Sequence, residues 1–180
     1  MRLLAIVVIV LSFLLTGPVG AQAPESSYVG KVYPPLPAGC VDEGARTGPT
    51  RATGHDLEIH EVNCATAKML WLAEFIALNP SDQPEGWRWR ATDVVSLPLL
   101  PAGYELFDHT VCYKIDDPRV YILAIGRRVS EKPVRGYHSG WHVADITHAW
   151  AANSETAHFE TISPKKVKCG ISEADILGNY

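Results

Sequence analysis

The sequence lacks any apolar run long enough to cross a membrane. The longest run, Leu3–Leu15, covers 13 residues, whereas a spanning helix needs about 20. Arg2 precedes this run, and small or turn-forming residues follow it as far as Ala21. This order is typical of a cleavable signal peptide, and the alternative interpretation is an uncleaved anchor. We therefore expect residues 1–21 to be a leader, export to the periplasm or the extracellular space, and no membrane span in the mature chain.

The sequence also lacks a strong charge of either sign. Its 16 Lys and Arg residues stand against 20 Asp and Glu residues. Loss of Arg2 with the leader leaves a net charge of −5. A mildly acidic chain has no electrostatic attraction for nucleic acid or anionic lipid. Glycine motifs that cradle phosphate are absent as well, so we expect no nucleic-acid partner and no cofactor.

Cysteine is scarce, and none of it occurs in a C-x-x-C pair. An even number of cysteines in an oxidising compartment predicts two disulfides, whereas wide spacings do not suit a zinc site. Four cysteines allow three connectivities, which the spacing does not distinguish. The four positions are Cys40, Cys64, Cys112 and Cys169.

Residues 57–78 are the strongest helix candidate in the chain. They are rich in good helix formers, and apolar residues recur on one helical face. Asn79-Pro80 would end such a helix. The helix would bring Cys64 to Cys40. The competing interpretation is two strands, 55–63 and 69–77, in which Cys64 would pair across the sheet, for instance with Cys112.

The remaining mature chain indicates strands and turns. Residues 87–97 begin with strand-like alternation, and residues 120–125 are continuously apolar, as in a central strand covered on both faces. Residues 22–54 are rich in Pro and Gly and predict an irregular arm. We therefore expect a single α+β domain over residues 55–180. Its architecture would be one main helix packed on an antiparallel sheet of about four or five strands, stapled by two disulfides.

An aromatic and cationic segment is a candidate interaction surface. Trp87 and Trp89 alternate with Arg88 and Arg90, which gives a strand one aromatic and one cationic face. Trp and Arg often anchor interfaces, and Trp141 is a further aromatic candidate. The structural alternative is that the tryptophans pack in the core while the arginines face water.

A histidine-rich stretch carries the competing, enzymatic hypothesis. His138, His142 and His148 accompany Asp145 within eleven residues, as in a metal site. On a helix, His138 and His142 would lie one turn apart, but neighbouring glycines disfavour a helix. On a strand they would lie about 13 Å apart, too far for ligands that must each reach one ion. A direct metal site is therefore not the leading expectation.

No nucleophile motif, phosphate motif or acid–base pair stands out in the sequence. We therefore expect a small exported binding or interaction protein rather than an enzyme. It would be an inhibitor-like or accessory module for an unknown protein or small ligand of the envelope or extracellular space. The alternative is a secreted metal-dependent hydrolase that uses the histidine stretch, and a third interpretation is a structural envelope component.

Overall fold

The computed structural model describes residues 25–51, 56–65, 67–76, 88–130 and 140–171. Over these ranges the chain forms eleven strands and two short 3₁₀ turns, and no α-helix. The leader predicted at residues 1–21 lies outside the described residues. None of the described residues forms a helix long and apolar enough to cross a membrane. In chain order the elements are η1 (Glu25–Ser27), β1 (Val32–Tyr33), β2 (Cys40–Thr50), β3 (Asp56–Cys64), β4 (Ala67–Ile76), β5 (Arg88–Ser96), β6 (Tyr104–Phe107), β7 (Cys112–Lys114), β8 (Tyr121–Ser130), β9 (Trp141–Asn153), β10 (His158–Thr161), η3 (Pro164–Lys166) and β11 (Val167–Ile171).

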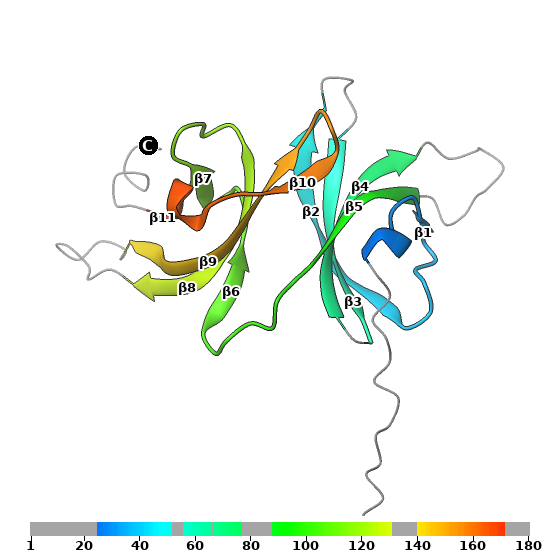
Figure 1. Cartoon of the computed structure of the whole chain (residues 1–180), viewed down its shortest axis with the longest axis horizontal. Helices are drawn as coiled ribbons and strands as arrows, with labels where there is room; N and C mark the ends of the chain where they lie inside the picture. The colour runs from blue at the N-terminus through cyan, green and yellow to red at the C-terminus, as the bar shows by residue number, and fades with distance from the viewer. Residues whose placement is uncertain (1–24, 52–55, 66, 77–87, 131–139, 172–180) are drawn as a thin grey trace, which may run out of the picture.

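The strands form two antiparallel sheets, which lie side by side in Figure 1. The first sheet has the order β1-β5-β4-β3-β2. The second has the order β6-β8-β9-β11-β7, with β10 also paired to β9. All strands of the first sheet precede those of the second, so the chain passes between the sheets once, through residues 97–103.

The largest apolar cluster lies between the two sheets. Leu57 and Leu72 of the first sheet belong to the same cluster as Leu123 and Trp150 of the second. Leu57, Leu72 and Leu123 are fully buried. Burying a leucine side chain contributes about 1.5–3 kcal/mol, so this layer holds the sheets together.

Each sheet is also covered on its outer face. The N-terminal arm places Tyr33 over Trp71 and Met69 of the first sheet. On the second sheet, β11 places Val167 in one cluster with Ile122 of β8. The middle of β4, from Met69 to Ala73, and the first part of β8, from Tyr121 to Gly126, are therefore buried on both faces. The prediction that residues 120–125 form a central strand is confirmed, because β8 lies between β6 and β9.

The predicted α+β architecture, with one main helix on a sheet, is wrong. Residues expected to form that helix make β3 and β4, which pair with each other as a hairpin. In β4, Leu70 and Leu72 face the second sheet, while Met69 and Trp71 face the arm. A strand covered on both faces is continuously apolar, so its apolar residues also fit a helical period. Tertiary packing overrode helix propensity here.

The N-terminal arm is more regular than its composition predicts. Residues 40–50 form β2, the edge strand of the first sheet, although the whole of 22–54 was expected to be irregular. Only the part before Cys40 is mainly non-strand, with η1 and the two-residue β1. The division of the mature chain at residue 54 stays a prediction.

Both disulfides predicted from the cysteine count are present. Cys40 pairs with Cys64, and Cys112 pairs with Cys169. Each bridge joins cysteines that lie directly opposite each other on neighbouring strands of one sheet. The Cys40–Cys64 pair was expected to accompany the helix, but it occurs on strands, and the alternative Cys64–Cys112 pairing is wrong.

Candidate functional site

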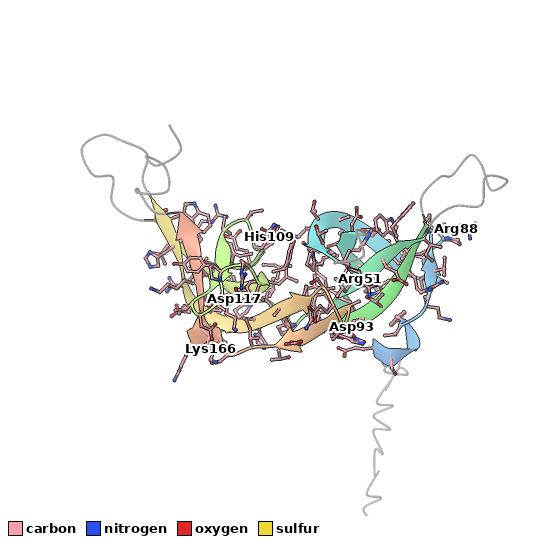
Figure 2. The ribbon with its side chains drawn as sticks, turned by 90° about the horizontal axis from the view of Figure 1, so that it is seen from above. Arg51, Arg88, Asp93, His109, Asp117 and Lys166 are labelled. Atoms are coloured by element: carbon pink, nitrogen blue, oxygen red, sulfur yellow. A yellow bond between two sulfur atoms is a disulfide. The ribbon has the colours of Figure 1, made fainter. Side chains whose placement is uncertain are left out.

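The predicted tryptophan–arginine surface is divided by the packing of β5. Trp87 lies outside the described residues. Trp89 is half-buried, with its ring centroid 5.5 Å from that of His60. Arg90 is exposed and pairs with Glu74 at 3.2 Å. Arg88 is exposed at the far end of the first sheet, well away from Asp117 in Figure 2.

The fifth member of that predicted surface, Trp141, lies elsewhere in the molecule. It packs with Phe107 in the outer layer of the second sheet, at a centroid distance of 5.7 Å. The guanidinium carbon of Arg128 lies 4.4 Å from the centre of the Trp141 ring. Trp89 belongs to the outer layer of the first sheet. The structure therefore does not bring these two tryptophans together.

The predicted histidine site is not assembled by the described residues. His138 lies outside them. His142 lies opposite Val129 and His148 opposite Ile125, four residues apart on β8, which corresponds to about 13 Å. The His148 Nδ1 atom contacts the neighbouring Thr147 hydroxyl at 3.0 Å.

Asp145, the carboxylate of that hypothesis, is also otherwise engaged. It pairs with Arg127 at 2.7 Å. Across the part of the chain that the structure describes, no group of three His, Cys, Asp or Glu side chains is placed to hold a metal ion. The metal-dependent hydrolase therefore gains no support from the structure.

A buried histidine under the N-terminal arm is the clearest polar feature that the sequence did not reveal. His60 is 4% exposed. Its Nδ1 atom lies 2.8 Å from Asp42 and its Nε2 atom 3.3 Å from Glu58. The Tyr33 ring packs against it at a centroid distance of 5.2 Å. The arm buries the imidazole itself, whereas the Asp42 and Glu58 carboxylates are partly exposed, and we interpret the cluster as structural.

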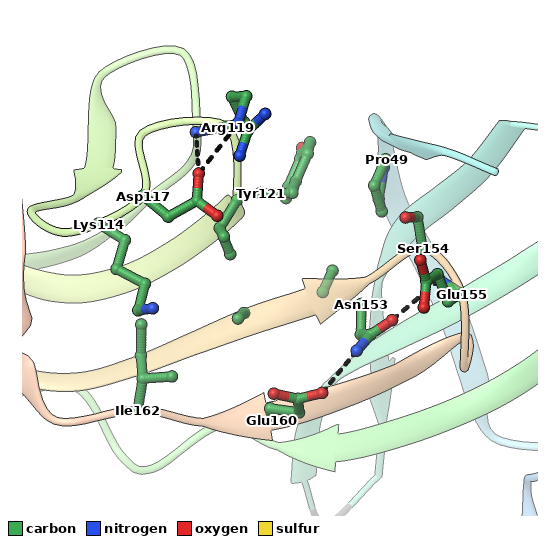
Figure 3. Close-up of a pocket in the computed structure, with 13 residues that line it drawn as sticks. Pro49, Lys114, Asp117, Arg119, Tyr121, Asn153, Ser154, Glu155, Glu160 and Ile162 are labelled. Atoms are coloured by element: carbon green, nitrogen blue, oxygen red, sulfur yellow. Dashed lines mark hydrogen bonds and ion pairs between the residues drawn. The ribbon is translucent and has the colours of Figure 1, made fainter. Parts of the chain in front are cut away.

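The second sheet carries an open pocket of about 630 Å³. One wall is the segment that leads from β7 into β8, and the other is the β9–β10 hairpin (Figure 3). Pro49, near the end of β2, lines the pocket on the side of the first sheet. Its lining residues are Pro49, Lys114, Asp117, Arg119, Val120, Tyr121, Ala151, Ala152, Asn153, Ser154, Glu155, Glu160 and Ile162.

On the β7–β8 wall, each basic side chain has an acidic partner. Lys114 pairs with Asp116 at 2.9 Å, and Arg119 pairs with Asp117 at 3.2 Å. A hydrogen bond from the Arg119 backbone N–H, and then one from its guanidinium, lower the pKa of Asp117. This wall therefore carries little uncompensated charge.

On the hairpin wall, two carboxylates have no cationic partner among the described residues. The Glu160 Oε1 atom accepts a hydrogen bond of 2.7 Å from the Asn153 amide. The Glu155 carboxylate has no partner among the described residues. Arg51 donates to the Glu155 backbone carbonyl at 3.4 Å, but its ion pair is with Glu74. The pocket is therefore electronegative on this side.

The remaining lining is largely apolar and fixed. Ala151 and Ala152 are buried in β9, and Ile162 is half-buried beside them. Tyr121 donates its hydroxyl hydrogen bond to the Thr47 carbonyl of the first sheet, and burial raises the pKa of this hydroxyl. The tyrosine is thus held in place by β2 of the first sheet and does not swing into the pocket.

Little in the sequence predicts this pocket. The residues Asp116-Asp117-Pro118 have the composition of a turn, but no sequence pattern links them to Glu155 and Glu160. The two walls meet only because β10 and the β7–β8 segment lie near one another across β9, which is a tertiary relationship. Comparison of the chain with protein-family models, with curated proteins and with solved structures finds no match.

Proposed function

We propose that the chain is exported and works as a binding protein without catalytic activity, and that the pocket holds a positively charged group of its ligand. The observation that carries this proposal is the pair of carboxylates, Glu155 and Glu160, on one wall of the pocket. Two anionic side chains that have no cationic partner within the described part of the chain attract a cation from solution.

The apolar lining supports a ligand with an aliphatic stem. Ala152 and Ile162 border the carboxylates within the same pocket. Arginine and lysine side chains carry a charged head on an apolar stem, which suits such a lining. A volume of about 630 Å³ lies within the usual range for ligand sites. A basic residue in a peptide or protein segment therefore fits best.

Export is supported by the leader-like start of the sequence and by the two disulfides. Disulfides persist in oxidising compartments such as the periplasm and the extracellular space. The partner would then be a protein or peptide of the same compartment.

The test is a titration followed by NMR on the disulfide-bonded protein. The side-chain amide of Asn153 is a direct reporter, because it donates to Glu160. The probe is the blocked tripeptide acetyl-Ala-Arg-Ala-amide. Its neutral match is the same peptide with citrulline in place of arginine. We expect the arginine peptide to shift the Asn153 amide signals with saturation, and the citrulline peptide to bind much more weakly.

Variants separate this site from general surface charge. Glu155→Gln combined with Glu160→Gln should lower the affinity for the arginine peptide by roughly tenfold, because each exposed charge contact contributes up to about 1 kcal/mol. Glu105→Gln removes a carboxylate on β6 that is not part of the pocket lining, and should leave affinity unchanged. Equal binding of both peptides, or equal loss in the control variant, would contradict the proposal.

A further inference from the structure

The segment that joins the two sheets is anchored at both ends and exposed in its middle. Residues 97–103 read Leu-Pro-Leu-Leu-Pro-Ala-Gly and connect β5 to β6. Figure 1 shows this segment as the green trace between the two sheets. It contains no strand or helix.

Both ends of the segment are anchored to the body. Leu97 is 8% exposed, and its backbone N–H donates to the Lys68 carbonyl at 2.8 Å. Leu100 is partly buried against the cluster between the sheets. The Tyr104 N–H donates to the Pro101 carbonyl at 3.0 Å, which closes a turn at the second end. The middle of the segment is thus held from both sides.

Two prolines restrict the backbone between these anchors. Each proline fixes its own φ near −65°. Each also pushes the residue before it, here Leu97 and Leu100, towards extended conformations. Four of the five residues 97–101 are therefore restricted before any partner arrives, and Leu99 lies between the two restricted pairs. A segment restricted in this way loses little conformational freedom when it binds.

Leu99 projects from the middle of this restricted segment. Its exposed fraction is 97%, whereas the next most exposed large apolar residue that the structure describes, Val41, is at 64%. Among the described residues, none pairs with the backbone N–H or C=O of Leu99. The segment thus offers one apolar side chain together with free main-chain groups, between residues that the prolines bias towards extended conformations. Binding of an extended peptide uses both: main-chain hydrogen bonds give affinity, and pockets for side chains give specificity.

We propose that residues 98–102 form the contact loop of an inhibitor of an extracellular endopeptidase, with Leu99 occupying the enzyme's apolar specificity pocket. Endopeptidases with such a pocket, like chymotrypsin, select an apolar side chain at this position, whereas trypsin carries an aspartate that selects a cation. Protease–inhibitor complexes form with little backbone movement, as expected for a loop anchored at both ends. The proposal does not involve the pocket on the second sheet, so either proposal can fail without the other.

The experiment replaces the apolar side chain of the loop with a cationic one, so that the loop matches trypsin in place of chymotrypsin. The disulfide-bonded wild-type chain and its Leu99→Lys variant are each titrated against chymotrypsin and trypsin, and inhibition constants are measured. We expect the wild type to inhibit chymotrypsin. The inhibition constant of the variant for chymotrypsin should rise at least about 30-fold, as for loss of a hot-spot side chain. The variant should also inhibit trypsin. Val41→Lys is the matched control, since it places the same charge on another exposed apolar residue, and it should behave as the wild type.

Two readouts keep the outcome decisive. Because Leu99 is almost fully exposed, the variant should retain the thermal midpoint of the wild type, so a loss of inhibition does not reflect unfolding. Mass spectrometry of the incubated mixtures shows whether the Leu99–Leu100 bond is cut. Rapid cutting of this bond without inhibition, or no inhibition of chymotrypsin by the wild type and of trypsin by the variant, overturns the proposal.

Discussion

Gly170 illustrates how closely β11 approaches β9. Its φ is 152°, and a Cβ at this position would lie 2.5 Å from the Trp141 carbonyl oxygen and 2.8 Å from the His142 Cα. Both neighbours are backbone atoms, which do not move aside easily. Gly39 also has a positive φ, of 81°, but nothing lies within 4 Å of a Cβ there. The two glycines therefore separate backbone strain from steric overlap.

We expect Gly170→Ala to reduce the free energy of unfolding by about 2–5 kcal/mol, because strain and overpacking add. Gly39→Ala should reduce it by only about 1–2 kcal/mol, because this substitution introduces backbone strain without steric overlap. Urea denaturation with intact disulfides measures both values. Equal losses for the two variants would show that β11 moves away from β9 to accommodate the methyl group.

At the scale of elements, Arg46 of β2 links both sheets. It forms an ion pair with Glu61 of β3 and another, of 2.8 Å, with Asp108 in the segment after β6. Burial alone would raise the pKa of Glu61 and Asp108. For Glu61, Arg46 and then Lys68 outweigh burial and lower the pKa; for Asp108, Thr110 and Arg46 do so. Carboxyl groups with lowered folded-state pKa values stabilise the fold above their ordinary pKa of about 4, and this contribution disappears as the pH falls through the lowered values.

Arg46→Gln should therefore cost about 1–2 kcal/mol at pH 7. The difference from the wild type should shrink below pH 4, as the carboxyl groups become protonated. Chemical denaturation between pH 2.5 and 7 measures this dependence. Arg119→Gln, whose arginine is 89% exposed, serves as the control and should change stability little at any pH. A loss for Arg46→Gln that is independent of pH would assign its role to packing instead.

The same elements show what the sequence predicts and where prediction stops. The turn at residues 116–118 and the buried strand β8 follow from local chemistry. Local chemistry does not predict that β3 and β4 form where a helix was favoured. Leu70 and Trp71 are buried on opposite faces of β4 by partners that are distant in sequence. The disulfide count followed from compartment and composition, whereas the pairing required the register of β2 with β3 and of β7 with β11. The pocket depends on which loops lie beside β9, and no local pattern encodes that.

At the scale of the whole molecule, each disulfide closes within one sheet and neither crosses between them. The sheets are joined by side-chain packing and by a few polar contacts. The Phe159 N–H of β10, for example, donates to Asp93 of β5 at 2.7 Å. Because both sheets share one buried cluster, each depends on the other for half of its covering. We therefore expect the molecule to unfold as one cooperative unit.

Removal of the Cys112–Cys169 bridge tests this cooperativity. The bridge spans 57 residues, and its loss should cost about 4 kcal/mol in the chain-entropy account. Cys112→Ala combined with Cys169→Ala should therefore lower the hydrogen-exchange protection of the most protected amides in β4 by the same amount as in β8 and β9. Unchanged protection in β4 would mean that the first sheet folds independently.

The single passage of the chain between the sheets has a further consequence. A cut after Leu99 would leave two pieces, each closed by its own internal bridge, and no covalent bond would remain between them. What would hold them is the shared apolar layer, so their association would become a bimolecular equilibrium that depends on dilution. The molecule is therefore a natural candidate for fragment complementation, in which two separately produced halves reconstitute one structure on mixing.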